Sequence, residues 1–150
     1  MSKNAEIARM FFEIANLLQM KGVDWKPNAY RKAAHSIETL AEPVEEMYSQ
    51  GGVKALKEIP GVGESIAEKI EEFLTKGAIA EFEKLTKGVP KGVGEMMHVP
   101  GLGPKKAMRL YKELRITSVA ALKAAAKAGR LQRLDGFGQK SEADILRGLR

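Results

Sequence analysis

Three short glycine motifs are the residues of this 150-residue sequence whose types and spacing could do chemistry. The segments IPGVGESIAEKI (59–70), VPGLGPKKAMRL (99–110) and LDGFGQKSEADI (134–145) each place Gly-x-Gly directly before a stretch with helical periodicity. Glycine takes backbone angles that other residues avoid, and it lets a ligand approach the backbone closely. The first N–H groups of the following helix are available to bind an anion. Each motif is therefore predicted to bind phosphate through its hairpin glycines, which are Gly61, Gly63, Gly101, Gly103, Gly136 and Gly138.

The repetition of the motif separates this prediction from other glycine-rich sites. A dinucleotide-binding Gly-x-Gly-x-x-Gly is not matched, because Ile66, Lys106 and Ser141 stand where the third glycine would be. The copies start 40 and then 35 residues apart, which is too uneven for a solenoid. The third copy departs most, with Glu142 at a position that is alanine in the other two. The shared pattern is similar to helix-hairpin-helix motifs, modules that hold DNA backbones without reading the base sequence.

Positive charge gathers in the part of the sequence that holds the second and third motifs. Residues 91–150 contain 13 Lys and Arg against 5 Asp and Glu, a net charge of +8. Residues 1–90 contain 12 Lys and Arg against 14 Asp and Glu, a net charge of −2. A basic surface attracts polyanions such as nucleic acid, although a solvated basic surface without a partner is the alternative. The side chains predicted to contact DNA phosphates are Lys105, Lys106, Arg109 and Lys140.

Helical periodicity runs through nearly the whole sequence, and no segment shows sustained strand alternation. A first helix is predicted to end near Gly22, followed by a second over 28–40 and a shorter third over 42–51. The glycine-rich segment 87–95 is predicted to be a linker. The sequence therefore predicts an all-α fold of two small helical subdomains, 1–87 and 88–150, built around the three helix-hairpin-helix motifs.

The order of these motifs resembles the N-terminal region of family X DNA polymerases. The resemblance covers essentially the whole chain, and it is carried by NAYRKAAHSIETL (28–40), EIPGVGESIAEKIEEFLTKG (58–77) and VPGLGPKKAMRLYKELRITSV (99–119). It implies a lyase-like helical domain followed by a duplex-binding domain. The region of the third repeat is most similar to bacterial and archaeal members.

The resemblance also implies a covalent reaction. In this family the N-terminal domain removes a 5′-deoxyribose phosphate, because a lysine forms a Schiff base with the sugar aldehyde and β-elimination follows. That lysine corresponds to Lys69, and Glu68 corresponds to the acid beside it. Three further residues match the family's pocket, a phosphate-contacting lysine, a tyrosine and a basic residue before the hairpin, which are Lys26, Tyr30 and Lys57.

The spacing around Lys69 leaves its role open. The helical period places this lysine at the margin of an apolar face, where partial burial would favour the neutral amine that a nucleophile requires. The alternative is an ordinary surface lysine paired with Glu64 or Glu72. The pocket also departs from the family pattern, since Ser65 and Glu81 stand in place of lysines.

Two kinds of metal ion follow from the resemblance. Family hairpins hold a monovalent cation on backbone carbonyls, and hard carbonyl oxygens suit K⁺ or Na⁺. The carbonyls that correspond are those of Lys57, Ile59 and Val62 in the first motif and Met97, Val99 and Leu102 in the second. The carboxylates of the family's palm, which hold two Mg²⁺ ions, have no counterpart in this sequence, so Mg²⁺ is expected only in a full-length polymerase. The missing palm favours the N-terminal part of a longer polymerase, with a stand-alone relative as the alternative.

Three functions stay open on the sequence alone. The chain is a DNA-binding region of a family X repair polymerase with lyase chemistry at Lys69, a non-enzymatic helix-hairpin-helix DNA-binding module, or a protein-interaction domain. The expected partner is gapped, nicked or 5′-phosphorylated DNA, with no membrane, and the expected state is a monomer in a prokaryotic cytoplasm, associated with the nucleoid. Stacking on an unpaired base or sugar is one interpretation of Trp25 and Tyr30. The alternative for Trp25, a cover over the first core, is the more usual role of such a tryptophan.

Overall fold

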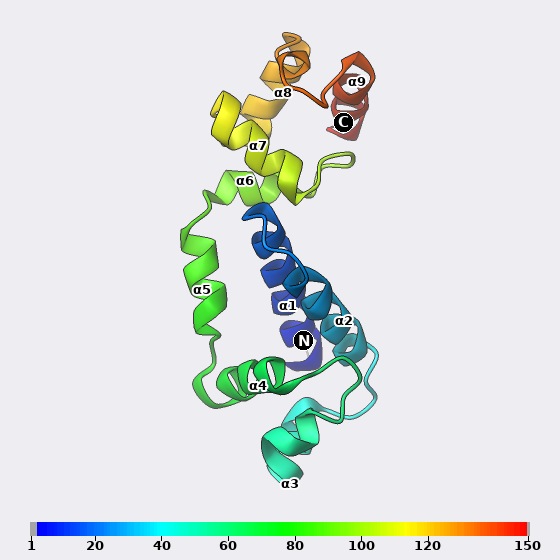
Figure 1. Cartoon of the computed structure of the whole chain (residues 1–150), viewed down its shortest axis with the longest axis vertical. Helices are drawn as coiled ribbons and strands as arrows, with labels where there is room; N and C mark the ends of the chain where they lie inside the picture. Colours follow the sequence, from blue (N-terminus) through cyan, green and yellow to red (C-terminus); the bar gives the residue numbers. More distant parts are fainter. Residues whose placement is uncertain (1–2, 150) are drawn as a thin grey trace. The chain divides into compact units, whose positions relative to one another are not determined.

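The computed structural model describes residues 3–149, which form helices and turns but no strand (Figure 1). The prediction of an all-α fold is confirmed. The chain divides into two compact units, one of Met1–Gln19 and Val23–Leu85 and the other of Met20–Gly22 and Thr86–Arg150. None of the helices in the described part of the chain is long and apolar enough to cross a membrane.

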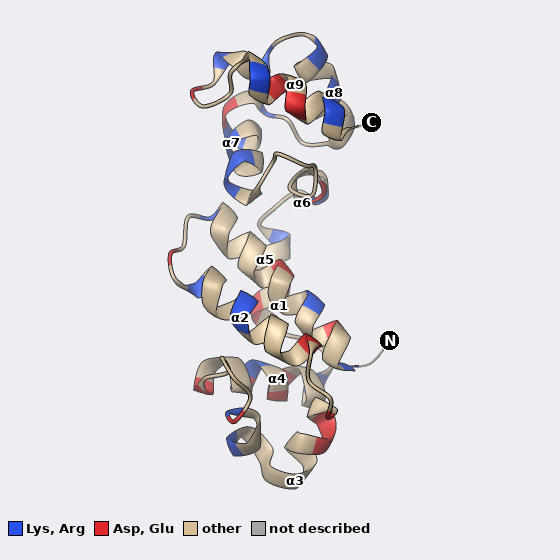
Figure 2. Cartoon of the chain, turned by 90° about the vertical axis from the view of Figure 1, so that its right-hand side faces the viewer, with Lys and Arg blue, Asp and Glu red and all other residues tan. Residues whose placement is uncertain are grey.

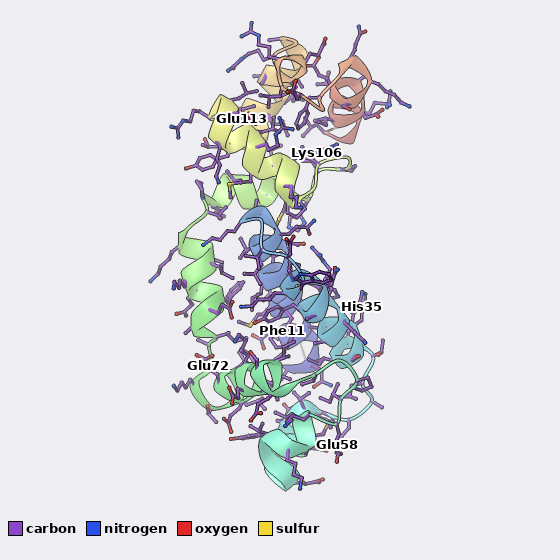
Figure 3. All side chains as sticks on the ribbon, viewed as in Figure 1. Phe11, His35, Glu58, Glu72, Lys106 and Glu113 are labelled. Atoms are coloured by element: carbon purple, nitrogen blue, oxygen red, sulfur yellow. The ribbon has the colours of Figure 1, made fainter. Side chains whose placement is uncertain are left out.

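The core of the first unit lies where its first two helices pack together. Ile7, Phe11 and Ile14, which share one face of the first helix, are fully buried. Phe11 lies in the interior of this unit (Figure 3). Its ring meets the ring of Tyr30 edge-on, with 5.5 Å between the centroids. The helices of this unit are α1 (Lys3–Met20), α2 (Lys26–Glu38), α3 (Val44–Leu56), α4 (Glu64–Lys76) and α5 (Ala80–Lys87), the last as far as Leu85.

The helix α3 is longer than the sequence predicted. It does not end at Gly51, because Gly52 takes φ 63° and ψ −154° inside it and the helical turns then resume as far as Leu56. Glycine adopts such angles without the steric cost that other residues meet. The resumed turns lead into the first hairpin, so they supply the first helix of the first helix-hairpin-helix motif.

The second unit contains the two remaining motifs. Its core is formed by fully or almost fully buried apolar side chains, among them Val93, Leu110, Leu122 and Phe137. The helix α8 begins at an N-cap serine, since the Oγ of Ser118 accepts a hydrogen bond from the Ala121 N–H at 3.0 Å. The helices are α6 (Lys91–Met96), α7 (Pro104–Leu114), α8 (Val119–Lys127), the 3₁₀ turn η1 (Leu131–Arg133) and α9 (Gln139–Gly148).

The predicted linker 87–95 is partly wrong, because its second half lies in α6. This helix is the first helix of the second motif, and two glycines in it gave the segment the composition of a loop. Gly92 has a packing role instead: a Cβ at this position would overlap the carbonyl oxygen of Thr117. The glycine therefore lets α6 approach the backbone ahead of α8.

Replacing Gly92 with alanine is expected to destabilise the second unit by about 1–3 kcal/mol, because the added methyl group meets backbone that cannot rotate away. Gly94→Ala is the matched control on the same helix, since no described atom lies within 4 Å of a Cβ there. That control should stabilise the chain by up to about 1 kcal/mol through helix propensity. Urea unfolding of both variants measures the difference, and equal stabilities would contradict the close approach.

The departure of the third repeat at Glu142 has a structural cause. Ala67 and Ala107, at the equivalent positions, are fully buried, and Glu142 is also buried. Its carboxylate accepts hydrogen bonds from the Leu131 N–H at 3.1 Å and from the Gln132 side-chain amide at 2.6 Å. The acid thus joins η1 to α9, and a small residue there would leave those donors without this acceptor.

Candidate nucleic-acid interface

The three predicted hairpins share one backbone geometry. Their first glycines have φ of 84°, 86° and 87°, in the region where a side chain is strained. In each hairpin the N–H of the middle residue bonds to the carbonyl three residues earlier, as in Val62 to Ile59 at 3.0 Å and Leu102 to Val99 at 2.9 Å. The middle side chains, which include Phe137 in the third hairpin, are buried and anchor each hairpin in the core of its unit.

The second glycine of each hairpin has a different reason to be glycine. Gly63, Gly103 and Gly138 have φ between −88° and −90° and extended ψ, which any residue adopts. All three are exposed, and no atom of the described residues lies within 4 Å of a Cβ built on any of them. Neither conformation nor packing within the chain calls for glycine here. The missing side chain leaves the backbone open to a molecule outside the chain.

Each hairpin leads directly into a helix whose first-turn N–H groups point toward it, although α7 begins with Pro104, which has no N–H. The intrahelical ladder starts at the second glycine, with bonds from Ala67 to Gly63 at 2.9 Å and from Ala107 to Gly103 at 3.0 Å. The N–H groups ahead of these lack helical partners, and the helix dipole favours an anion beside them. The first turns of α4 and α9 contain an acidic residue, whereas that of α7 contains none among its described residues. The second hairpin is therefore the most favourable of the three for a phosphate.

Exposed lysines surround the hairpins of the second unit. Lys105 and Lys106 follow the second hairpin on α7, and Lys140 follows the third on α9, and all three are exposed. Further Lys and Arg residues lie on α8 and around the turn that follows it (Figure 2). Lys106 also lies over the ring of Phe137, with its Nζ 5.7 Å from the ring centroid.

Arg109 has partners within the chain that the sequence did not predict. Its Nη1 donates to the carbonyl oxygen of Asp135 at 2.7 Å, and its Nε donates to Glu113 at 3.0 Å. Its guanidinium lies 5.6 Å from the centre of the Phe137 ring. The side chain thus connects α7 to the third hairpin, and its predicted contact with DNA stays a prediction.

The first hairpin forms one wall of a pocket of about 350 Å³ in the first unit. The pocket brings together residues from α2, α4 and α5 with the hairpin. The pocket lining includes five residues that were predicted for the site, namely Lys26, Tyr30, Gly61, Gly63 and Lys69. It also includes Glu64, Ser65 and Glu81.

Lys69 and Glu81 form an ion pair in this pocket. The Lys69 Nζ lies 3.2 Å from the Glu81 Oε2, with the two side chains 20% and 30% exposed. The surface pairings considered for Lys69 are wrong: Glu64 faces Lys57 at 3.8 Å, and Glu72 accepts the Ala80 N–H at 3.0 Å. The candidate nucleophile is therefore largely buried, beside one carboxylate.

Tyr30 reaches the same carboxylate oxygen. Its hydroxyl donates to the Glu81 Oε2 at 3.1 Å, while its ring is buried. Burial, and then the charge of Glu81, raise the pKa of Tyr30 well above its ordinary value, so the phenol stays protonated at neutral pH. Tyr30 is only 5% exposed, which does not favour the predicted stacking of its ring on an unpaired base or sugar.

Two residues predicted for this site lie outside the pocket lining. Lys57 and Glu68 are exposed on the surface of the first unit and do not line the pocket, so their assigned roles stay predictions. Glu81 stands where the family pattern has a lysine, and its contacts could not be predicted from the sequence. Gly77, with φ 77°, ends α4 and turns the chain so that α5 places Glu81 against Lys69. No spacing rule in the sequence encodes that contact.

Trp25 is held in a strained turn beside the pocket. The carbonyl of Asp24 accepts the Lys26 N–H at 2.8 Å, and Trp25 between them has φ 70° and ψ −51°. This is a γ-turn of the rare, strained kind. The indole is 88% exposed, so the alternative that Trp25 covers the first core is wrong. The turn thus presents the indole to solvent at the residue directly before Lys26 of the pocket lining.

Comparisons with known proteins agree with the two units. Residues 2–79 match the family described as helix-hairpin-helix domain, and residues 93–150 match the SAM-like helix-hairpin-helix tandem. The DNA polymerase/3′-5′ exonuclease PolX of Bacillus subtilis (strain 168) is 35% identical over 145 residues, covering 96% of this chain and 24% of that protein. DNA polymerase lambda of Arabidopsis thaliana and of Rattus norvegicus are each 28% identical over 111 residues, covering 73% of the chain and 20% and 18% of those proteins. The chain thus spans about a quarter or less of the length of these relatives.

Proposed function

We propose that this chain binds DNA by contacting the phosphates of the DNA backbone. The chain belongs to the helix-hairpin-helix domain family and is similar to the N-terminal region of family X DNA polymerases. The observation that carries the proposal is the exposed second glycine of each hairpin. Neither the backbone angles nor the packing of the described residues requires a glycine at these positions. Backbone N–H groups at a helix N-terminus bind a phosphate oxygen without contact to the bases. Binding is therefore independent of base sequence.

The second unit is proposed to hold the duplex. Its two hairpins combine open helix N-termini with the exposed lysines Lys105, Lys106 and Lys140. Point charges around a neutral backbone clamp attract the phosphates and make the affinity depend on salt. The contacts of Arg109 hold the third hairpin against α7, the helix that follows the second hairpin, so the two hairpins of this unit are joined to one another.

The pocket of the first unit is proposed to receive a 5′ end at a gap or nick. Lys26 supplies a positive charge at its edge, and the first hairpin supplies helix N–H groups. The specific observation that favours lyase chemistry is the burial of Lys69 in this pocket, which an ordinary surface lysine does not show. Its amine would attack the aldehyde of an opened deoxyribose, form a Schiff base and allow β-elimination of the 3′ phosphate. A non-enzymatic DNA-binding module is the alternative.

The hairpins are also proposed to hold K⁺ or Na⁺. Lys57 and Met97 end the helices ahead of the first two hairpins with the same angles, φ −68° and ψ −13°. Their carbonyls lie at helix C-termini, where the dipole favours a cation. The described residues contain no cluster of three His, Asp or Glu side chains that could hold a metal ion, so main-chain oxygens are the fitting donors. A bound ion would supply positive charge beside a DNA phosphate.

The fluorescence of Trp25 is expected to report the binding of gapped DNA. It is the one tryptophan of the sequence and is 88% exposed, so stacking on an unpaired base should quench it and shift its emission. If about four phosphates are neutralised, raising the salt from about 50 to about 200 mM should weaken binding about 100-fold. Titration with gapped and intact duplexes at both salt concentrations measures these effects. Affinity that does not change with salt would contradict phosphate binding and favour a protein-interaction domain.

A further inference from the structure

Glu81 is the one acidic side chain that the described structure places in ionic contact with Lys69. It lies in the first turn of α5, and its Oε2 is 3.2 Å from the Lys69 Nζ. The other charged or titratable groups that line the pocket are Lys26 and Tyr30 from α2 and Glu64 from α4. The carboxylate of Glu64 lies 3.8 Å from the Nζ of Lys57, with which it is paired. Any proton that leaves the Lys69 ammonium within the pocket therefore meets Glu81 first.

The contact with Tyr30 holds this carboxylate in place. The phenol donates its hydrogen to the same Oε2 that faces Lys69, which orients the carboxylate toward the amine. The phenol is the donor of this hydrogen bond and stays protonated at neutral pH, so it cannot itself act as a base there. The Glu81 carboxylate keeps further lone pairs that can accept a proton. The side chains of Lys69 and Glu81 are both mostly shielded from water.

We propose that Glu81 is a catalytic residue that takes the proton from the Lys69 ammonium and returns it to the departing water. The inference rests on the lyase function proposed for Lys69. One proton moves from Nζ to Oε2, and the freed lone pair attacks the aldehyde carbon. The resulting carbinolamine loses its hydroxyl as water when Glu81 gives the proton back, and a protonated C=N bond remains. The ammonium and the aldehyde thus become an iminium ion and water, with the carboxylate regenerated.

The opposite role for the same ion pair is inhibition, in which Glu81 only holds Lys69 in its charged form. The two roles predict opposite effects of removing the carboxylate charge. Glu81→Gln keeps the size and the hydrogen-bonding oxygen of the side chain but is not a base. If Glu81 restrains Lys69, this variant reacts faster than the parent chain; if Glu81 is the base, it reacts more slowly.

The test measures the rate of borohydride trapping on pre-incised abasic DNA. Glu81→Gln should lower this rate at neutral pH by about 100-fold or more, the usual range for a general base. Glu81→Asp, which retains a carboxylate, should recover part of the rate. Glu83→Gln, an exposed acid on the same helix outside the pocket lining, should leave it unchanged.

The outcomes separate this inference from the function on which it rests. Trapping of the parent chain with an equal or faster rate in Glu81→Gln overturns the role of Glu81 and leaves the lyase standing. Failure of the parent chain to form an adduct overturns both. DNA affinity, measured by gel shift, should be equal or higher in Glu81→Gln, because a negative charge is removed from the pocket. A loss of affinity that accounts for the whole loss of rate would also overturn the proposal.

Discussion

Replacing Lys69 with alanine is expected to abolish borohydride trapping of the chain on pre-incised abasic DNA while leaving its affinity for duplex DNA within about twofold. Trapping requires a neutral amine that reaches an aldehyde carbon, and Lys69 is the lysine that lies largely buried in the pocket beside Glu81. Lys26, the other lysine that lines the pocket, is exposed, and no ion pair of Lys26 is seen among the described residues. Duplex affinity should persist because the lysines around the second and third hairpins belong to the other unit.

Two controls make the loss specific to the amine. Lys69→Arg retains the positive charge and an ion pair with Glu81, but a guanidinium does not form a Schiff base under these conditions. It should therefore lose trapping as completely as alanine. Lys76→Ala removes an exposed lysine from the same helix, α4, outside the pocket lining, and should keep the adduct. Trapping that survives in both Lys69 variants would assign the adduct to another amine.

The hairpins could be predicted from the sequence because they depend on local rules. Gly-x-Gly before an amphipathic stretch repeats three times, and each first glycine indeed takes a left-handed φ. Of the two reasons predicted for glycine, only the close approach of a ligand is left for Gly63, Gly103 and Gly138, because their backbone angles are ordinary. A sequence shows that a residue is glycine but not whether conformation, packing or an external ligand requires it. Only the structure separates Gly92, which packs against backbone, from Gly103, which packs against nothing described.

The pocket could be predicted only in part because it depends on angles between helices. Lys26, Tyr30 and Lys69 were assigned to one site, and the structure does bring them together. The contact of Glu81 with Lys69 depends on the turn at Gly77 and the direction of α5, which no periodicity encodes. Trp25 was equally inaccessible to sequence rules. A lone tryptophan beside an apolar helix is usually buried, but here the residue lies in a γ-turn and its indole is exposed to solvent.

Gly103→Asp is expected to weaken duplex DNA binding by about 10- to 100-fold, because charge-assisted hydrogen bonds to a phosphate contribute about 1.5–3 kcal/mol and the new carboxylate repels the phosphate. The same change should leave the chain as stable as before, or more stable by a few tenths of a kcal/mol. Gly103 is the N-cap of α7, where aspartate is preferred, and its backbone angles suit any residue. An aspartate there can accept from the helix N–H groups that the phosphate would otherwise receive.

This combination of opposite effects distinguishes a binding glycine from a structural one. If Gly103 served the fold, its replacement would lower stability and affinity together. Urea unfolding and gel shifts on the same preparation measure both quantities. Gly138→Asp is the matched control, since it adds the same charge at the same N-cap position of α9. Its effect on affinity should be smaller, because the first turn of α9 already contains Glu142, whereas that of α7 carries Lys105 and Lys106. Equal losses of affinity in the two variants would contradict the leading role of the second hairpin, and unchanged affinity in both would contradict phosphate binding at the hairpins.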